Sequence, residues 1–159
     1  MNRRTLLPLV SLLVIGAIVI GAILVFRGAP TGTRKELTII GGETRKDWEK
    51  GGFALLGGEV TSPGPTIRVK KGDQVTITFR NVHGTYARER ISHNFVVVAE
   101  IKTFPRFAEP LWGAKIDPIQ VGKSISVTFT PNAAGDFFYV CDVPGHPERG
   151  MYGSFIVEE

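Results

Sequence analysis

The segment from Phe137 to Val157 constrains this chain more than any other. It contains the only cysteine, Cys141, and then His146 and Met151 at intervals of five residues, after a run of aromatic residues typical of a strand. A thiolate, an imidazole and a thioether in one loop are difficult to explain as unrelated packing residues. These ligand types suit copper, and one more histidine would complete a trigonal His2Cys site with a weak axial Met. We therefore expect the chain to bind one copper ion.

The second imidazole must be His83 or His93, because the chain has only three histidines. His93 begins the apolar run Phe95–Val98, so a regular strand could aim its side chain at the loop. His83 precedes a glycine in a polar turn, and the alternative for it is a solvated histidine that could help to cover the site. We favour His93 as the ligand. Its neighbour Asn94 is a candidate hydrogen-bond donor to the cysteine sulfur, as a constraint outside the ligand shell.

Composition excludes several classes of protein. One cysteine cannot form an internal disulfide or a dinuclear copper centre, and three histidines are too few for a trinuclear copper cluster within this chain. The formal net charge of +4 includes Arg3, Arg4 and Arg27 around the first apolar run, and the rest of the chain has 16 Lys and Arg against 15 Asp and Glu. This balance argues against nucleic-acid binding.

An uncharged stretch of 22 residues, Thr5 to Phe26, is long enough to cross a bilayer core of about 30 Å as a helix. We expect a membrane anchor over residues 1–27, and the alternative is a cleaved signal peptide, whose apolar core is usually shorter. Residues 28–35 read as a linker and residues 36–159 as the folded domain. Arg3 and Arg4 favour a cytoplasmic N-terminus, which places that domain on the extracytoplasmic side of the cell membrane as a single-pass protein.

Short strand patterns separated by turns fill the rest of the chain and predict an all-β sandwich. The expected strands are Glu36–Ile40, Phe53–Val60, Ile67–Lys70, Gln74–Val82, His93–Ala99, Lys123–Thr130, Gly135–Cys141 and Tyr152–Glu158. Alternation in two of them predicts inward-facing residues: Val75, Ile77 and Phe79 in one, and Ile125, Val127 and Phe129 in the other. Thr44–Lys50 could form one helical turn. Ile101–Val121 reads as a long connection with at most a short helix.

In five segments the chain resembles cupredoxins, and within them the rusticyanin- and sulfocyanin-like blue copper proteins. These segments are Phe138–His146, Gly150–Gly153, Ser92–Phe95, Pro63–Ile67 and Val69–Asp73. The resemblance covers roughly residues 36–159. It implies a cupredoxin-like Greek-key β-sandwich, here preceded by one N-terminal transmembrane helix. It also implies one type 1 copper ion with the ligands His93, Cys141, His146 and Met151.

The resemblance further implies an electron-transfer protein rather than an enzyme. We expect a membrane-anchored one-electron carrier between respiratory partners, such as a cytochrome or a terminal oxidase, with a monomeric soluble domain. Electrons would leave through His146, and Arg88, Arg90 and Arg149 could form a positive rim around it. Two alternatives stay open: a copper storage or delivery protein, and an accessory domain through which electrons reach an oxidase or reductase complex.

Overall fold

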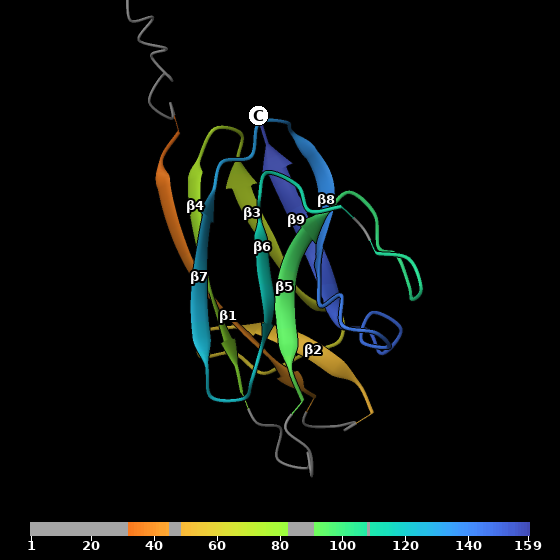
Figure 1. Ribbon diagram of the computed structural model, residues 1–159. Coiled ribbons are helices and arrows are strands. Elements are labelled where there is room, and N and C mark those ends of the chain that lie inside the picture. Colours follow the sequence, from red (N-terminus) through yellow and green to blue (C-terminus); the bar gives the residue numbers. More distant parts are fainter. Residues whose placement is uncertain (1–31, 45–48, 83–90, 108) are drawn as a thin grey trace, which may run out of the picture.

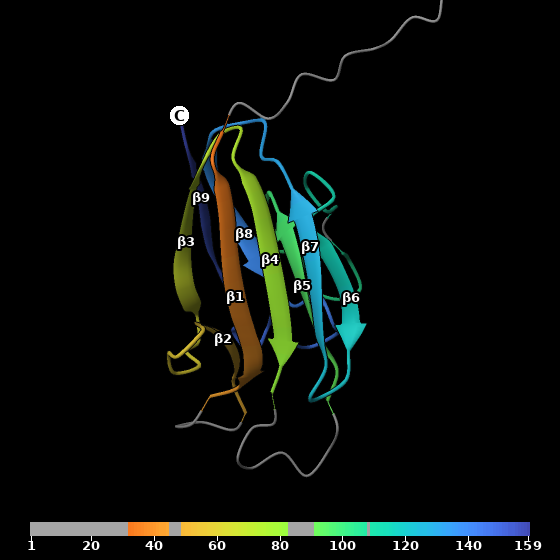
Figure 2. The same cartoon turned by 90° about the vertical axis from the view of Figure 1, so that its left-hand side faces the viewer.

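The computed structural model describes residues 32–44, 49–82, 91–107 and 109–159, and these ranges form nine strands and no helix. The strands are β1 (Arg34–Glu43), β2 (Gly51–Leu55), β3 (Gly64–Lys70), β4 (Gln74–Asn81), β5 (His93–Val98), β6 (Lys115–Ile119), β7 (Ser124–Phe129), β8 (Gly135–Val140) and β9 (Tyr152–Glu158). They pack as two facing layers (Figures 1 and 2). The predicted all-β sandwich is therefore confirmed.

The two layers differ in size and in strand order. The four-stranded sheet has the order β2-β1-β4-β7, and the five-stranded sheet has the order β3-β9-β8-β5-β6. The pairs β1–β4 and β3–β9 are parallel, and the other pairs are antiparallel. Since many strands that are consecutive in sequence lie in different sheets, the chain crosses repeatedly between the layers. These crossings bring distant segments together at the ends of the sandwich.

The space between the sheets is filled by aromatic and branched side chains. Val75, Ile77 and Phe79 of the central strand β4 are fully buried, which confirms the inward face predicted for this strand. From the other sheet, Tyr139 packs edge-on against Phe53, with 5.0 Å between the ring centroids. Such apolar burial is the main favourable contribution to folding.

The inward face predicted for Lys123–Thr130 is only partly correct. Phe129 is buried and Val127 is half-buried against the core, but Ile125 is 49% exposed. The reason is the position of β7 at the edge of its sheet, where it has one neighbouring strand, β4. Alternation in sequence separates the two faces of a strand, but it does not show how far the opposite sheet extends over its edge.

The interpretation of Ile101–Val121 as a connection is wrong for its second half, which contains strand β6. This strand pairs only with β5 and forms the edge of the five-stranded sheet. Pro118 has no backbone N–H to donate, and an edge strand tolerates this because one of its sides needs no hydrogen bonds to a neighbouring strand. The described part of the segment contains no helix.

Strand boundaries also differ from the expected ones. The strand β2 ends at Leu55 rather than Val60, because the chain turns at Gly57, whose φ of 85° favours glycine. The strand β1 begins at Arg34, two residues before the expected domain boundary. The predicted anchor, the first half of the predicted linker and most of the helical turn expected at Thr44–Lys50 lie outside the described residues. Nowhere in the described ranges is there a helix with the length and apolar character needed to span a bilayer.

Candidate metal centre

Two strand ends of the five-stranded sheet bring His93 and Cys141 together. His93 is the first residue of β5 and is only 4% exposed, and Cys141 directly follows β8 and is fully buried. Because β5 and β8 are antiparallel neighbours, with Val96 opposite Val140, the start of one strand lies beside the end of the other. The sheet register thus fixes both side chains at one end of the sandwich.

The loop from Cys141 to Met151 is a compact series of hydrogen-bonded turns. The amide of Met151 donates to the carbonyl of His146, and the amide of Cys141 donates to the carbonyl of Met151, each at 3.0 Å. Gly145 and Gly150 have φ values of 85° and 82°, so both turns favour glycine. The loop therefore has a defined backbone that returns Met151 to the base of Cys141.

Three donor atoms converge in this structure. The Nδ1 atoms of His93 and His146 are 3.1 Å apart, and the Sγ atom of Cys141 lies 3.2 Å from Nδ1 of His146 and 3.9 Å from Nδ1 of His93. All three residues present a ligand atom within 4.8 Å of the others. Among the three histidines, His93 and His146 meet the cysteine, and His83 lies outside the described residues. In both imidazoles, Nδ1 is the atom directed at the cluster.

Met151 is fully buried beside this cluster, immediately before β9. Two glycines of the opposite sheet leave room for its side chain. A methyl group added to Gly51 would lie 3.2 Å from the Met151 sulfur, and one added to Gly41 would lie 3.1 Å from the Met151 Cε. The thioether is therefore held between the loop and the strands β1 and β2. These two glycines were not predicted from the sequence, although glycine inside a strand pattern often marks such a close approach.

Asn94 joins the two strands that carry the cysteine and the first histidine. Its backbone amide donates to the Cys141 sulfur at 3.4 Å, which confirms the expected constraint. Its side chain accepts a hydrogen bond from the Asp142 amide at 2.9 Å and donates to the Asp142 carboxylate at 2.5 Å. These bonds hold the cysteine against the start of β5. An amide pointing at the sulfur also stabilises negative charge on it.

Burial keeps the donor groups uncharged while no metal is bound. It raises the pKa of the Cys141 thiol to about 12. It also lowers the pKa of His93 to about 4, with the neighbouring His146 adding to the effect. The pKa of His146 is lowered by burial and then by the positive charge of Arg149, against the opposing effect of Glu148. Both imidazoles are thus ready to bind a metal near neutral pH, whereas the thiol must lose a proton.

The chemistry of these donors fits copper better than a hard cation. A thiolate, two imidazoles and a thioether are soft or intermediate ligands, whereas magnesium and calcium prefer oxygen. Among the described residues, no carboxylate belongs to the converging cluster. Arg149 lies next to the two histidines at a small pocket, and Arg88 and Arg90 lie outside the described residues. A positive rim made by all three arginines therefore stays a prediction.

Comparison with known proteins adds independent information. A family model described as multicopper oxidase matches residues 54–159 of this chain. Rusticyanin from Acidithiobacillus ferridurans is 31% identical over 106 residues, an alignment that covers 59% of this chain and 50% of rusticyanin. The chain thus spans about half the length of this curated relative.

Two solved structures resemble the fold. Rusticyanin from Thiobacillus ferrooxidans superimposes with a TM-score of 0.58 and 24% identity, covering 78% of each chain. Dithionite-reduced auracyanin from Roseiflexus castenholzii gives a TM-score of 0.53 and 22% identity, covering 83% of this chain and all of auracyanin. At these identities the likeness concerns the fold alone.

Proposed function

This chain belongs to the multicopper oxidase family and has a cupredoxin fold whose cofactor is one type 1 copper ion, and on that premise we propose that it is a one-electron carrier. The observation that carries the proposal is the convergence of the His93 and His146 Nδ1 atoms on the buried Cys141 sulfur. We propose these three atoms and the Met151 sulfur as the ligands. Copper held this way supplies a reversible one-electron couple.

The chain's own residues would keep the site nearly unchanged between redox states. The loop backbone is fixed by its internal hydrogen bonds, and Cys141 and Met151 are fully buried. Asn94 clamps Asp142 and donates to the sulfur. A rigid set of donors that need not move when an electron arrives favours rapid transfer over the binding of a substrate. The burial of Cys141 also keeps water away from its thiolate.

His146 is the proposed exit for electrons. Unlike the buried His93, it is partly exposed, and the neighbouring Pro144 is exposed without carrying a charge. A small, mostly uncharged surface suits brief docking with a redox partner. The exposed Arg149 would add positive charge at its edge and favour an acidic partner. We propose a cytochrome or a terminal oxidase as that partner, and a monomeric carrier domain.

Membrane attachment is part of the proposal and depends on the sequence of residues 1–27. An apolar anchor would hold the copper domain on the extracytoplasmic face and confine its search for partners to the membrane surface. Fractionation with an alkaline wash tests this directly. We expect the full chain to stay with the membrane and a variant lacking residues 1–27 to be released. Release of the full chain would contradict the anchor.

The family match favours one second candidate, an accessory domain that passes electrons within a larger oxidase or reductase complex. The three histidines of the chain cannot supply a trinuclear cluster, so oxygen reduction would take place on another protein. Purification from native membranes distinguishes the two candidates. A carrier separates from its partner at moderate salt, whereas a subunit stays in a fixed stoichiometry.

Copper storage or delivery is less consistent with the donor set. Three of the four proposed ligands are buried, so a receiving protein could reach the metal only through the partly exposed His146. Competition with a chelator tests the alternative. A carrier should lose copper slowly over hours, and rapid exchange would favour delivery. The proposal as a whole is tested by the visible and EPR spectra of the copper-loaded protein, described at the end of the Discussion.

A further inference from the structure

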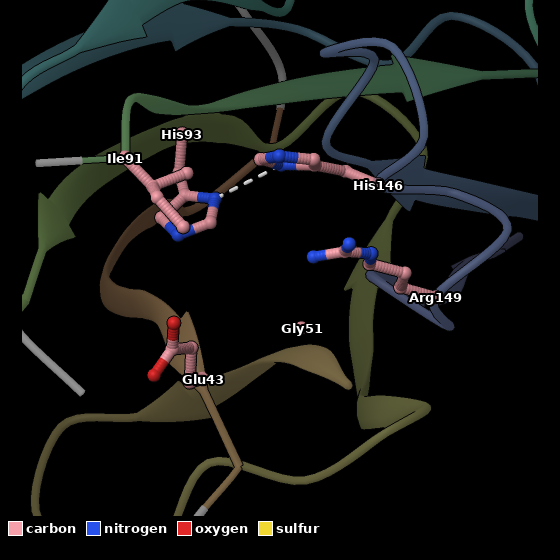
Figure 3. A pocket seen from close by; sticks show the side chains of 6 residues that line it. All are labelled: Glu43, Gly51, Ile91, His93, His146 and Arg149. Carbon is pink, nitrogen blue, oxygen red and sulfur yellow. Dashed lines mark hydrogen bonds between the residues drawn. The ribbon is translucent and has the colours of Figure 1, made fainter. Parts of the chain in front are cut away.

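A small pocket lies on the side of the two histidines that faces β1 and β2. It is lined by Glu43, Gly51, Ile91, His93, His146 and Arg149. Figure 3 shows the carboxylate of Glu43 and the guanidinium of Arg149 reaching into this space from different sides, with the two imidazoles across from them. One negative and one positive group therefore share a pocket with both proposed histidine ligands.

Glu43 is unusual among the polar side chains of the described residues. Its Oε2 atom is buried and has no hydrogen-bond partner, a property it shares only with Oδ1 of Asn81 among the described residues. Leaving a buried polar atom unpaired costs stability, because the atom has lost its hydrogen bonds to water. The exposed Arg149 forms no ion pair with it, although both line the same pocket. A carboxylate oxygen kept unpaired at this cost needs an explanation other than stability.

The orientation of His93 supplies that explanation. Its Nδ1 faces the cysteine and the other histidine, so its Nε2 is the nitrogen that carries a proton when Nδ1 binds a metal. Metal-bound histidines commonly direct this second nitrogen to a carboxylate, a carbonyl or water. The pocket volume of about 10 Å³ is close to the minimum for one water molecule, so there is room for about one water among the groups that line it.

We propose that Glu43 is a positioning residue that acts on the copper through His93, and that its negative charge lowers the reduction potential by stabilising the oxidised site. Arg149 opposes this effect from the other side of the pocket. A negative charge near the metal favours Cu(II) over Cu(I), and a positive charge does the reverse. The effect of Glu43 should be larger, because Glu43 is half-buried with one carboxylate oxygen out of contact with solvent, whereas Arg149 is exposed. This inference rests on the proposed copper site.

The test is the reduction potential of the copper-loaded full chain, measured by spectroelectrochemistry for the wild type and three variants. Glu43→Gln removes the charge at nearly constant shape and should raise the potential. Glu43→Asp keeps the charge and should shift the potential less than Glu43→Gln. Arg149→Gln should lower it, by a smaller amount. The matched control is Glu36→Gln on the same strand, whose side chain is 65% exposed and pairs with Arg34, and it should leave the potential unchanged.

A second measurement separates tuning from a structural role. Because the Glu43 oxygen is unpaired, the copper-free Glu43→Leu protein should unfold at the same temperature as wild type or at a higher one. A lower unfolding temperature together with an unchanged potential in Glu43→Gln would make Glu43 structural and overturn the inference. A blue Glu43→Gln protein with the wild-type potential would overturn it as well. If the wild type itself is not blue, the proposed function fails and not this inference alone.

Discussion

The five-stranded sheet carries the donor atoms, whereas the four-stranded sheet surrounds them without supplying one. His93 begins β5, Cys141 follows β8 and Met151 precedes β9, and these three strands belong to the larger sheet. From β1 and β2 of the smaller sheet come Gly51, which makes room for the thioether, and Glu43, which brings a carboxylate to the pocket. If the proposed ligands are correct, the strands of the larger sheet position the groups that bind the metal, and the smaller sheet adjusts how these groups are held. Substitutions of the residues carried by the larger sheet should therefore change metal binding itself, whereas those in the smaller sheet should change how the bound metal is held.

Cys141→Ser is expected to have the largest effect, because it replaces the thiolate by a hydroxyl that binds copper weakly. The intense blue absorption should disappear, and the EPR spectrum should become that of an ordinary copper(II) complex. Visible absorption of the copper-loaded variant checks this. Persistence of the blue band would mean that another residue supplies the strong ligand, and the assignment of donors to the larger sheet would be wrong.

Copper(II) binding should release about one proton per ion near neutral pH. In the metal-free protein the Cys141 thiol, with a pKa of about 12, is protonated, and His93, with a pKa of about 4, is already neutral. Only the thiol must therefore give up a proton, and the affinity should rise about tenfold for each pH unit between roughly 6 and 8. Calorimetry in buffers of different ionisation enthalpy measures the release. In Cys141→Ser it should vanish, and an undiminished release would place its source elsewhere.

Gly51→Ala tests whether the smaller sheet adjusts the thioether. The added methyl group would lie 3.2 Å from the Met151 sulfur, so the side chain must shift by a few tenths of an ångström. We expect a loss of about 1–3 kcal/mol in the free energy of unfolding and a changed, but still blue, visible spectrum. Gly42→Ala is the control, because its methyl group would crowd Val82 at 3.1 Å and not the thioether. Identical spectra for both variants would contradict the assignment.

Asn94→Ala should weaken the connection between β5 and the cysteine loop. It removes the side-chain bonds to Asp142 and leaves the buried backbone bond to the sulfur. The copper-free protein should lose about 1–3 kcal/mol of unfolding free energy in a urea titration. The comparison variant is Asn132→Ala, which removes an exposed bond from Trp112 and should cost about 1 kcal/mol or less. Equal losses in the two variants would show that the bonds to Asp142 contribute no more to stability than an exposed hydrogen bond does.

Ile125→Thr is expected to have the smallest effect, because this residue is half exposed on the edge strand β7. Its substitution should change the unfolding free energy by no more than about 0.5 kcal/mol. Val75→Ala in the buried centre of the same sheet is the contrast, and it should cost about 2 kcal/mol or more. Thermal unfolding of both variants checks the difference. A large loss in Ile125→Thr would mean that this edge is covered in solution.

Much of the fold was predictable where local pattern and burial coincide. The alternation of Val75, Ile77 and Phe79 identifies a central strand, because such a strand has a neighbour on each side and the second sheet over one face. The same reasoning misplaced Ile125, since alternation carries no information on coverage at an edge. Strand β6 was also missed, because Pro118 suggested a connection. A strand can contain this proline because it lies at the edge of its sheet.

The residues of the candidate site also differ in whether local sequence was enough to predict them. Cys141, His146 and Met151 lie within one short loop, so their spacing was visible in the sequence, and His93 stood out as a histidine at the start of an apolar strand. The contribution of Glu43 depends on how two sheets face each other across the core. A glutamate near the end of a strand otherwise resembles any polar residue there, so only the three-dimensional structure shows that its oxygen is buried and unpaired.

The most direct test of the account is the combined visible and EPR spectrum of the full-length protein loaded with one equivalent of copper(II). The account predicts an intense blue band from charge transfer between the Cys141 sulfur and copper, together with the narrow hyperfine splitting of a type 1 site. A colourless protein with the broad splitting of a tetragonal copper complex would contradict it.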